Sequence, residues 1–70
     1  MIRYTSDGAT VAQVLEEFGF ALDDDGIHWC YRGARGERRL AAGMLEGLLR
    51  EAGSSRLRAY VKQEKDLWEK

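Results

Sequence analysis

The apolar positions of the chain first alternate with polar ones and then take a helical spacing. In residues 1–5, Ile2 and Tyr4 alternate with polar side chains, which predicts a short, half-buried strand. Further along, the apolar positions recur three, four and seven residues apart, at Val11, Val14, Leu15 and Phe18. This spacing predicts a helix that places one face on a core and ends at Gly19.

A β-hairpin is predicted in the segment that follows. Phe20–Leu22 and Ile27–Arg32 read as two strands, and Asp23–Gly26 reads as the four-residue turn between them. On the second strand one face carries Ile27, Trp29 and Tyr31, and the other carries His28, Cys30 and Arg32. We expect Trp29 in the core or at a helix edge, Cys30 partly buried, and His28 at the surface or at an edge.

The second half of the chain returns to helical spacing. Gly33–Gly36 reads as a basic loop, and Gly53 as the cap that ends the helix after it. The apolar positions of that predicted helix are Leu40, Met44, Leu45, Leu48 and Ala52. Gly43 and Gly47, four residues apart in this helix, either mark a dimer or partner surface or make room for the sheet.

Residues 56–69 fit two patterns. Leu57 can share a helix face with Tyr60 or Val61 and with Leu67 or Trp68, and Ser54 and Ser55 can cap this helix; we favour this interpretation. The alternation of Leu57 and Val61 with polar neighbours also fits a strand. We therefore predict one α+β domain over residues 1–70, a small antiparallel sheet packed on two or three helices in the order βαββαα. The alternative is βαββαβ, the ferredoxin-like order.

Composition excludes several classes of protein. No apolar run approaches the roughly 18 residues of a membrane span, and one cysteine cannot form an internal disulfide. Arg3 and Asp7 interrupt any opening hydrophobic stretch, so we expect no signal peptide and a cytoplasmic location. A core built from 70 residues is small, which makes association with a partner or a second copy an expectation.

The formal net charge of −1 conceals an uneven distribution of charge along the chain. Residues 1–25 hold six acidic side chains and one arginine, whereas residues 26–39 hold four arginines and one glutamate. The acidic candidates for partner binding are Glu16, Glu17, Asp23, Asp24 and Asp25. The basic candidates for binding a partner or phosphate are Arg32, Arg35, Arg38 and Arg39. We expect two separate patches on the folded chain, each attracting its own kind of partner.

Guanidinium groups bind phosphates and carboxylates equally well, so the basic segment alone does not distinguish nucleic acid from protein. Strong nonspecific binding to nucleic acid normally accompanies a clearly positive charge, which this chain lacks. We expect no metal site, because zinc needs three or four ligands and the chain has one histidine and one cysteine. The consecutive carboxylates of Asp23–Asp25 also lack the alternation of a calcium loop. No cofactor is expected.

Stretches within residues 10–53 resemble the HicA-type toxins, small mRNA interferases with a fold like that of double-stranded-RNA-binding domains. The stretches are VLEEFGF at 14–20, GIHWCYR at 26–32 and GMLEGLLREAG at 43–53. The matching positions are Gly26, Tyr31, Arg32, Leu45, Leu49, Ala52 and Gly53. Trp29 stands where the family has its catalytic histidine and Ile27 where it has serine, and a third strand is nearly missing between Arg39 and Gly43.

Two functions are therefore predicted. The first is a non-enzymatic inhibitor or adaptor that docks through its acidic patch on a larger nucleic-acid-handling protein. In size and make-up the chain is similar to small inhibitors encoded by phages and mobile elements, anti-CRISPR proteins among them. The second, implied by the resemblance, is an RNA-binding or mRNA-cleaving toxin that uses His28 and the Arg32–Arg39 loop. His28 is the candidate catalytic residue because an unperturbed imidazole titrates near neutral pH.

Overall fold

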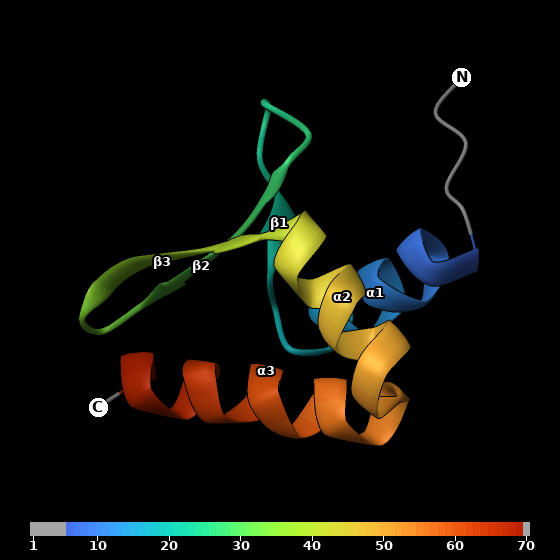
Figure 1. The fold of residues 1–70 in the computed structure, drawn as a ribbon. Helices are drawn as coiled ribbons and strands as arrows, with labels where there is room; N and C mark the ends of the chain where they lie inside the picture. The colour runs from blue at the N-terminus through green and yellow to red at the C-terminus, as the bar shows by residue number, and fades with distance from the viewer. Residues whose placement is uncertain (1–5, 70) are drawn as a thin grey trace.

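The computed structural model describes residues 6–69 and confirms the α+β class (Figure 1). Its elements are α1 (Ser6–Glu17), β1 (Ala21–Leu22), β2 (His28–Gly33), β3 (Gly36–Ala41), α2 (Ala42–Ala52) and α3 (Ser54–Glu69). The strands form one antiparallel sheet in the order β1-β2-β3. The strand predicted at residues 1–5 lies outside the described residues.

Helix α1 forms as its apolar spacing predicts. Val11, Val14 and Leu15 are buried against the other helices. The helix closes at Gly19, whose φ of 86° is a left-handed conformation that suits a residue without a side chain. The N–H of Phe20 then donates to the carbonyl of Leu15 at 2.9 Å, which turns the chain toward the sheet.

The hairpin predicted between Phe20 and Arg32 is present, with one correction on its buried face. Trp29 and Tyr31 share a buried face, but Ile27, predicted on the same face, precedes β2 and is 59% exposed. The N–H of Ala42 donates to the carbonyl of Ile27 at 2.9 Å, which attaches the backbone of Ile27 to the end of the sheet, while its side chain faces solvent.

The largest difference from the prediction is the third strand. The predicted loop Gly33–Gly36 is a tight turn, and the chain continues directly into β3, which pairs with β2 along its whole length. Helix α2 consequently begins at Ala42, two residues after the predicted Leu40. Leu40 lies opposite Trp29 in the sheet and is buried there, so burial in the sheet outweighs its fit to the helical pattern.

The last segment is a helix, as favoured, and the ferredoxin-like order is therefore wrong. Gly53, with a φ of 89°, joins α2 to α3, and its N–H donates to the carbonyl of Leu49 at 2.8 Å. Leu57 and Val61 are fully buried on the inner side of α3. None of the helices in residues 6–69 is both long enough and apolar enough to cross a membrane.

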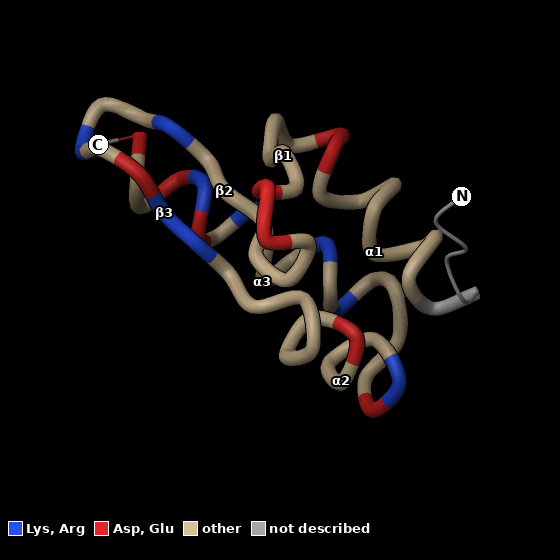
Figure 2. Tube along the Cα trace, turned by 90° about the horizontal axis from the view of Figure 1, so that it is seen from above, with Lys and Arg blue, Asp and Glu red and all other residues tan. Residues whose placement is uncertain are grey.

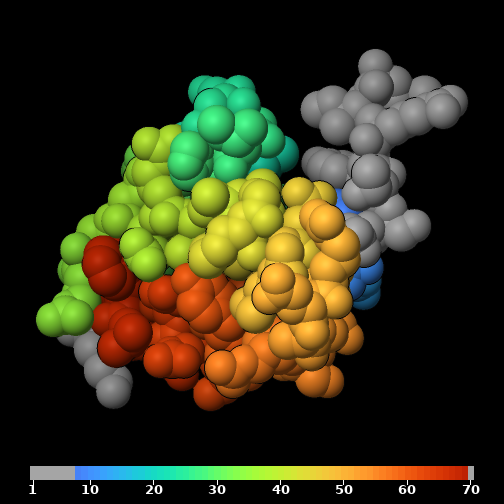
Figure 3. Space-filling view, in the orientation of Figure 1, coloured from blue at the N-terminus to red at the C-terminus, as the bar shows by residue number. Residues whose placement is uncertain are grey.

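The core lies between the helices and one face of the sheet. Its buried residues are Val11, Ala12, Val14, Leu15, Phe20, Trp29, Tyr31, Leu40, Leu45, Leu57 and Val61. In Figure 1 the helices lie below or beside the sheet, with α3 running along the β2–β3 hairpin. Among residues 6–69, no helix covers the opposite face of the hairpin. The β1–β2 turn rises on that side and projects from the body of the molecule in Figure 3.

Candidate interaction surface

The uncovered face of the sheet carries polar side chains from both long strands. We call it the open face and define it by His28, Cys30, Arg32, Glu37 and Arg39, with the Asp23–Gly26 turn beside it. Cross-strand pairing places Cys30 next to Arg39 and Arg32 next to Glu37. Because successive side chains of a strand point to opposite faces, these residues lie opposite buried Trp29, Tyr31 and Leu40.

Arg39 joins the β1–β2 turn to β3. Its Nη2 donates to Oδ2 of Asp23 at 2.6 Å and to Oδ2 of Asp25 at 3.2 Å. The same Oδ2 of Asp25 accepts a hydrogen bond from Nδ1 of His28 at 2.7 Å. Hydrogen bonds from the Ile27 N–H and the His28 side chain hold the pKa of Asp25 below its usual value. The result is a connected cluster of one arginine, two aspartates and one histidine.

Cys30 is half-buried at the centre of the open face. Burial raises the pKa of its thiol, and the carboxylates of Asp23 and Glu37 raise it further. A thiol in this environment stays protonated at neutral pH and is a poor nucleophile. In residues 6–69 no three His, Cys, Asp or Glu side chains are placed to hold a metal ion.

Two of the predicted basic residues lie at the end of the hairpin. Arg32 is on the open face, with 87% of its side chain exposed, and its Nε is 3.6 Å from Oε2 of Glu37. Arg35, in the β2–β3 turn, instead contacts the end of α3. Its N–H donates to the carbonyl of Trp68 at 3.2 Å and its Nη1 to that of Leu67 at 3.4 Å. The last carbonyls of a helix have no partner within the helix, so a cation that binds them stabilises the helix end.

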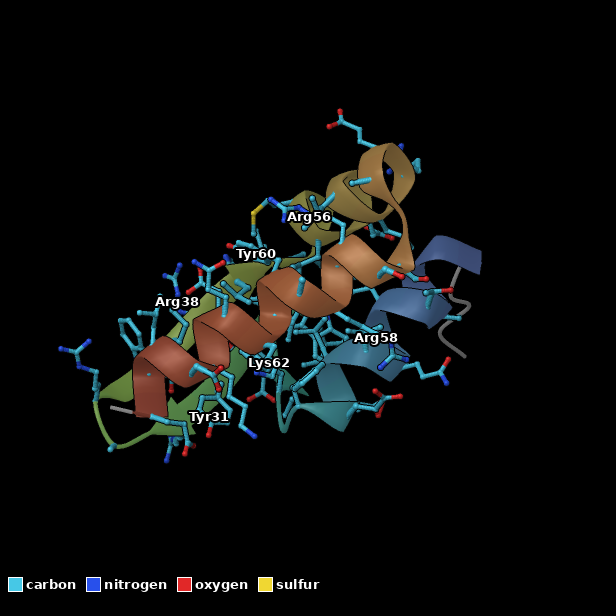
Figure 4. The ribbon with its side chains drawn as sticks, turned by 90° about the horizontal axis from the view of Figure 1, so that it is seen from below. Tyr31, Arg38, Arg56, Arg58, Tyr60 and Lys62 are labelled. Carbon is cyan, nitrogen blue, oxygen red and sulfur yellow. The ribbon has the colours of Figure 1, made fainter. Side chains whose placement is uncertain are left out.

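Arg38 points to the opposite side of the sheet, toward α3. Its Nε and Nη2 donate to the two carboxylate oxygens of Glu64 at 3.1 and 3.2 Å, and its guanidinium lies 5.5 Å from the ring centre of Trp68. These contacts lower the pKa of Glu64, and burial raises the pKa of the neighbouring Tyr60. Figure 4 shows Arg38 beside Tyr60 at the edge of α3. Arg38 is thus part of the packing between sheet and helix.

The predicted acidic residues do not form one patch. Glu17, on α1, pairs with Arg58 of α3, which lowers the pKa of its carboxyl group. Asp23 and Asp25 pair with Arg39, as described above. Glu16 and Asp24 are exposed. Figure 2 shows acidic and basic residues interspersed over the sheet and helices.

The expectation of two separate charged patches is therefore wrong. The strands bring the acidic turn next to β3, and α3 supplies partners for Glu17 and Arg38, so segments of opposite charge meet in the fold. The structure does bring together Asp23, Asp25, Arg32, Arg39 and His28 around one face. Glu37 belongs to the same face but was not among the predicted site residues. Residues two apart on a strand lie on the same face, so a strand at residues 36–41 would have placed Glu37 beside Arg39.

A small apolar pocket lies where α1 and α2 meet the β1–β2 turn. Its volume is about 130 Å³, and its lining includes Val11, Leu22, Trp29 and Ala42. Pockets that enclose drug-sized molecules typically have about 300–1,000 Å³. This pocket is therefore smaller than such sites.

Comparison with family models, curated proteins and solved structures finds no match to this chain. The resemblance to HicA-type toxins and the likeness to phage inhibitors therefore stay predictions.

Proposed function

We propose that this chain is a small protein-binding module that docks on a protein partner through its open face. The observation that carries the proposal is the arrangement of the sheet: one face buries the core against the helices, and the other presents ordered polar side chains. This proposal keeps the predicted docking function and replaces the acidic patch by a face of mixed charge. A role as inhibitor or adaptor on a nucleic-acid-handling protein remains a hypothesis within it.

The cluster around Arg39 supports docking because its side chains are held before a partner arrives. Binding normally costs about 0.5–1.5 kcal/mol for each flexible side chain that becomes fixed. Arg39 is already fixed by Asp23 and Asp25, and His28 by Asp25. Arg32, with its largely exposed guanidinium, remains available to reach a carboxylate on the partner.

The charges of the open face also indicate the chemistry of the partner. Asp23, Asp25 and Glu37 lie among Arg32 and Arg39, so neither sign dominates. A polyanion such as nucleic acid would meet carboxylates as well as arginines here. A protein surface that carries both signs can match the pattern, and such complementarity favours one partner over others. We therefore favour a protein over a nucleic acid at this face.

Charge reversals on the two sides of the molecule test the proposal. Arg32→Glu changes the open face at an exposed position, and Arg56→Glu makes the same charge change on α3, seen from the opposite side in Figure 4. We expect Arg32→Glu to lose a partner that the wild type and Arg56→Glu both capture from host lysate, as measured by quantitative mass spectrometry. Equal recovery of every protein by all three chains would contradict docking through the open face.

One observation favours RNA cleavage as a second candidate function. Asp25 holds Nδ1 of His28 and thereby leaves Nε2 as the nitrogen that can accept a proton. A carboxylate that orients an imidazole in this way is typical of a general base. Arg32 and Arg39 lie on the same face, although the two aspartates already neutralise Arg39.

This candidate predicts that the purified chain cleaves RNA and that His28→Gln abolishes cleavage. Glutamine keeps a hydrogen-bond donor near Asp25 but cannot transfer a proton near neutral pH. The measurement is gel analysis of labelled RNA, with circular dichroism to show that both chains are folded. Cleavage that survives in His28→Gln, or a wild-type chain without activity, would remove the enzyme from consideration.

A further inference from the structure

Strand β3 is the longer of the two outer strands of the sheet and has backbone groups that no strand pairs with in residues 6–69. In an antiparallel pair of strands, residue pairs that exchange backbone hydrogen bonds alternate with pairs that do not. The Ala42 N–H donates to the Ile27 carbonyl, so the bonded pairs are those of Leu40 with Trp29 and of Arg38 with Tyr31. Arg38 and Leu40 therefore direct their N–H and C=O groups toward β2. Glu37 and Arg39 direct theirs away from it, toward the free edge.

This edge lacks most of the features that keep edge strands from pairing. It has no proline, its register with β2 is unbroken over six residue pairs, and Figure 2 shows β3 along the margin of the molecule. Its protection consists of charged side chains alone. Charges repel most strands, but they attract a strand whose charges are complementary.

We propose that β3 pairs with β3 of a second copy of this chain in an antiparallel, two-fold symmetric arrangement. Glu37, Arg39 and Ala41 have their backbone groups at the free edge, and the registers that overlap most of β3 place Glu37 and Arg39 opposite each other or opposite themselves. With Glu37 opposite Arg39 of the second copy, symmetry produces two identical contacts between opposite charges on the open face, in addition to the pairs that Arg39 makes with Asp23 and Asp25. The neighbouring registers place Arg39 opposite Arg39 or Glu37 opposite Glu37, and both bring like charges together. Charge thus selects one register.

The selected register also brings Arg38 next to Arg38 of the second copy on the helix side of the sheet. Each guanidinium is already bound by its own Glu64 at 3.1 and 3.2 Å and lies against Trp68. Two neutral ion pairs therefore meet at the axis. The small core of a 70-residue chain is a further reason for association, because a dimer shields more of the sheet from water.

This pairing would join the two sheets into one of six strands, β1-β2-β3-β3-β2-β1. All helices would stay on one side, and the two open faces would lie next to each other on the other side. The inference does not depend on the proposed function, because the pairing uses the backbone edge of β3, whereas docking uses the side chains of the open face. The two share the side chains of Glu37 and Arg39. If both hold, the docking surface is twice as large and symmetric.

Reversal of one charge tests the pairing by sedimentation velocity over a range of concentrations. Glu37→Arg places arginine opposite Arg39 of the second copy, whereas Glu51→Arg makes the same charge change at an exposed position of α2. We expect the wild type and Glu51→Arg to dimerise. We expect Glu37→Arg to raise the dissociation constant about tenfold, because attraction becomes repulsion at both pairs.

Amide hydrogen exchange provides the second measurement. In the dimer, the amides of Glu37 and Arg39 become protected as concentration rises, while those of Arg38 and Leu40 are protected at every concentration. A chain that stays monomeric at its highest soluble concentration would overturn the inference. The inference would also be overturned if Glu37→Arg still dimerised and the amides of Glu37 and Arg39 in the wild-type dimer stayed unprotected. Neither result affects docking through the open face, which the capture experiment tests separately.

Discussion

Arg38 and Arg39 are adjacent in the sequence but have different surroundings in the fold. Successive side chains of a strand point to opposite faces, so Arg38 meets Glu64 and Trp68 and Arg39 meets the aspartates of the β1–β2 turn. The side chain of Glu64 is only 14% exposed, so a carboxylate there needs a cation beside it. Arg38 therefore belongs to the packing between the sheet and α3.

Removal of Arg38 is expected to destabilise the protein far more than removal of Arg32. Arg38→Ala leaves the carboxylate of Glu64 without its partner and uncovers Trp68, for an expected loss of about 2 kcal/mol in the free energy of unfolding. Arg32→Ala removes an exposed pair and is expected to cost less than about 0.5 kcal/mol. Urea denaturation measures both. Equal stabilities of the two variants would contradict the role given to Arg38.

The pair between Arg38 and Glu64 also predicts a dependence of stability on pH. Arg38 lowers the pKa of Glu64 in the folded state, so near the ordinary value of 4.5 the unfolded chain binds more protons than the folded chain. The stabilisation is present above this pH and is lost as the pH falls below it. We expect the stability difference between wild type and Glu64→Gln to shrink on acidification. A difference independent of pH, measured by urea unfolding, would contradict this.

The sequence contained the residues of the candidate site but did not reveal their pairing. Asp23, Asp25, Arg32, Arg39 and His28 were identified from their chemistry. Their grouping depends on contacts such as Arg39 to Asp23, which are 16 residues apart and meet only because β1 and β3 flank the same strand. Charge counted along the chain could not predict this, since the folding of the sheet brings the acidic turn over the basic strand.

Among the elements, the helices were easier to predict than the third strand. Residues 11–18 and 54–69 have spacings that match their structures, and Gly19 and Gly53 end α1 and α2 as expected. Residues 36–41 are rich in charge and contain one large apolar side chain, Leu40. They form a strand because β2 supplies a partner over six residue pairs, a tertiary effect with little local signal.

The contact between the β2–β3 turn and α3 yields a prediction at the scale of elements. A β-carbon at Gly33 would lie 2.6 Å from the carbonyl oxygen of Trp68, which is backbone and cannot easily move. We expect Gly33→Ala to cost about 2 kcal/mol in stability, because the end of α3 must shift away.

A second glycine is the matched control. A β-carbon at Gly43 meets nothing within 4 Å, and the same holds for Gly47, so these glycines do not make room for the sheet. Gly43→Ala is expected to stabilise α2 by up to about 1 kcal/mol. Thermal unfolding of both variants separates the two effects. A stable Gly33→Ala would show that the hairpin and α3 do not pack as described.

At the scale of the whole molecule, the fold separates a packing side from an exposed side. The buried apolar side chains lie between the helices and the inner face of the sheet, and the Arg38–Glu64 pair lies on the same side. The outer face carries ordered polar groups, and within residues 6–69 no strand pairs with the outer edge of β3. A chain of this size with one bare sheet face is suited to association, and the class of fold was predictable from the periodicity even though this face was not.

Chemical-shift mapping tests the claim that the open face is the docking surface most directly. The uniformly ¹⁵N-labelled chain is titrated with the partner recovered in the capture experiment, and its backbone amide signals are followed by NMR. We predict that the largest shifts occur at Cys30, Arg32 and Glu37, while Arg56 on α3 stays unchanged. Shifts confined to α3, with the signals of β2 and β3 unmoved, would contradict it.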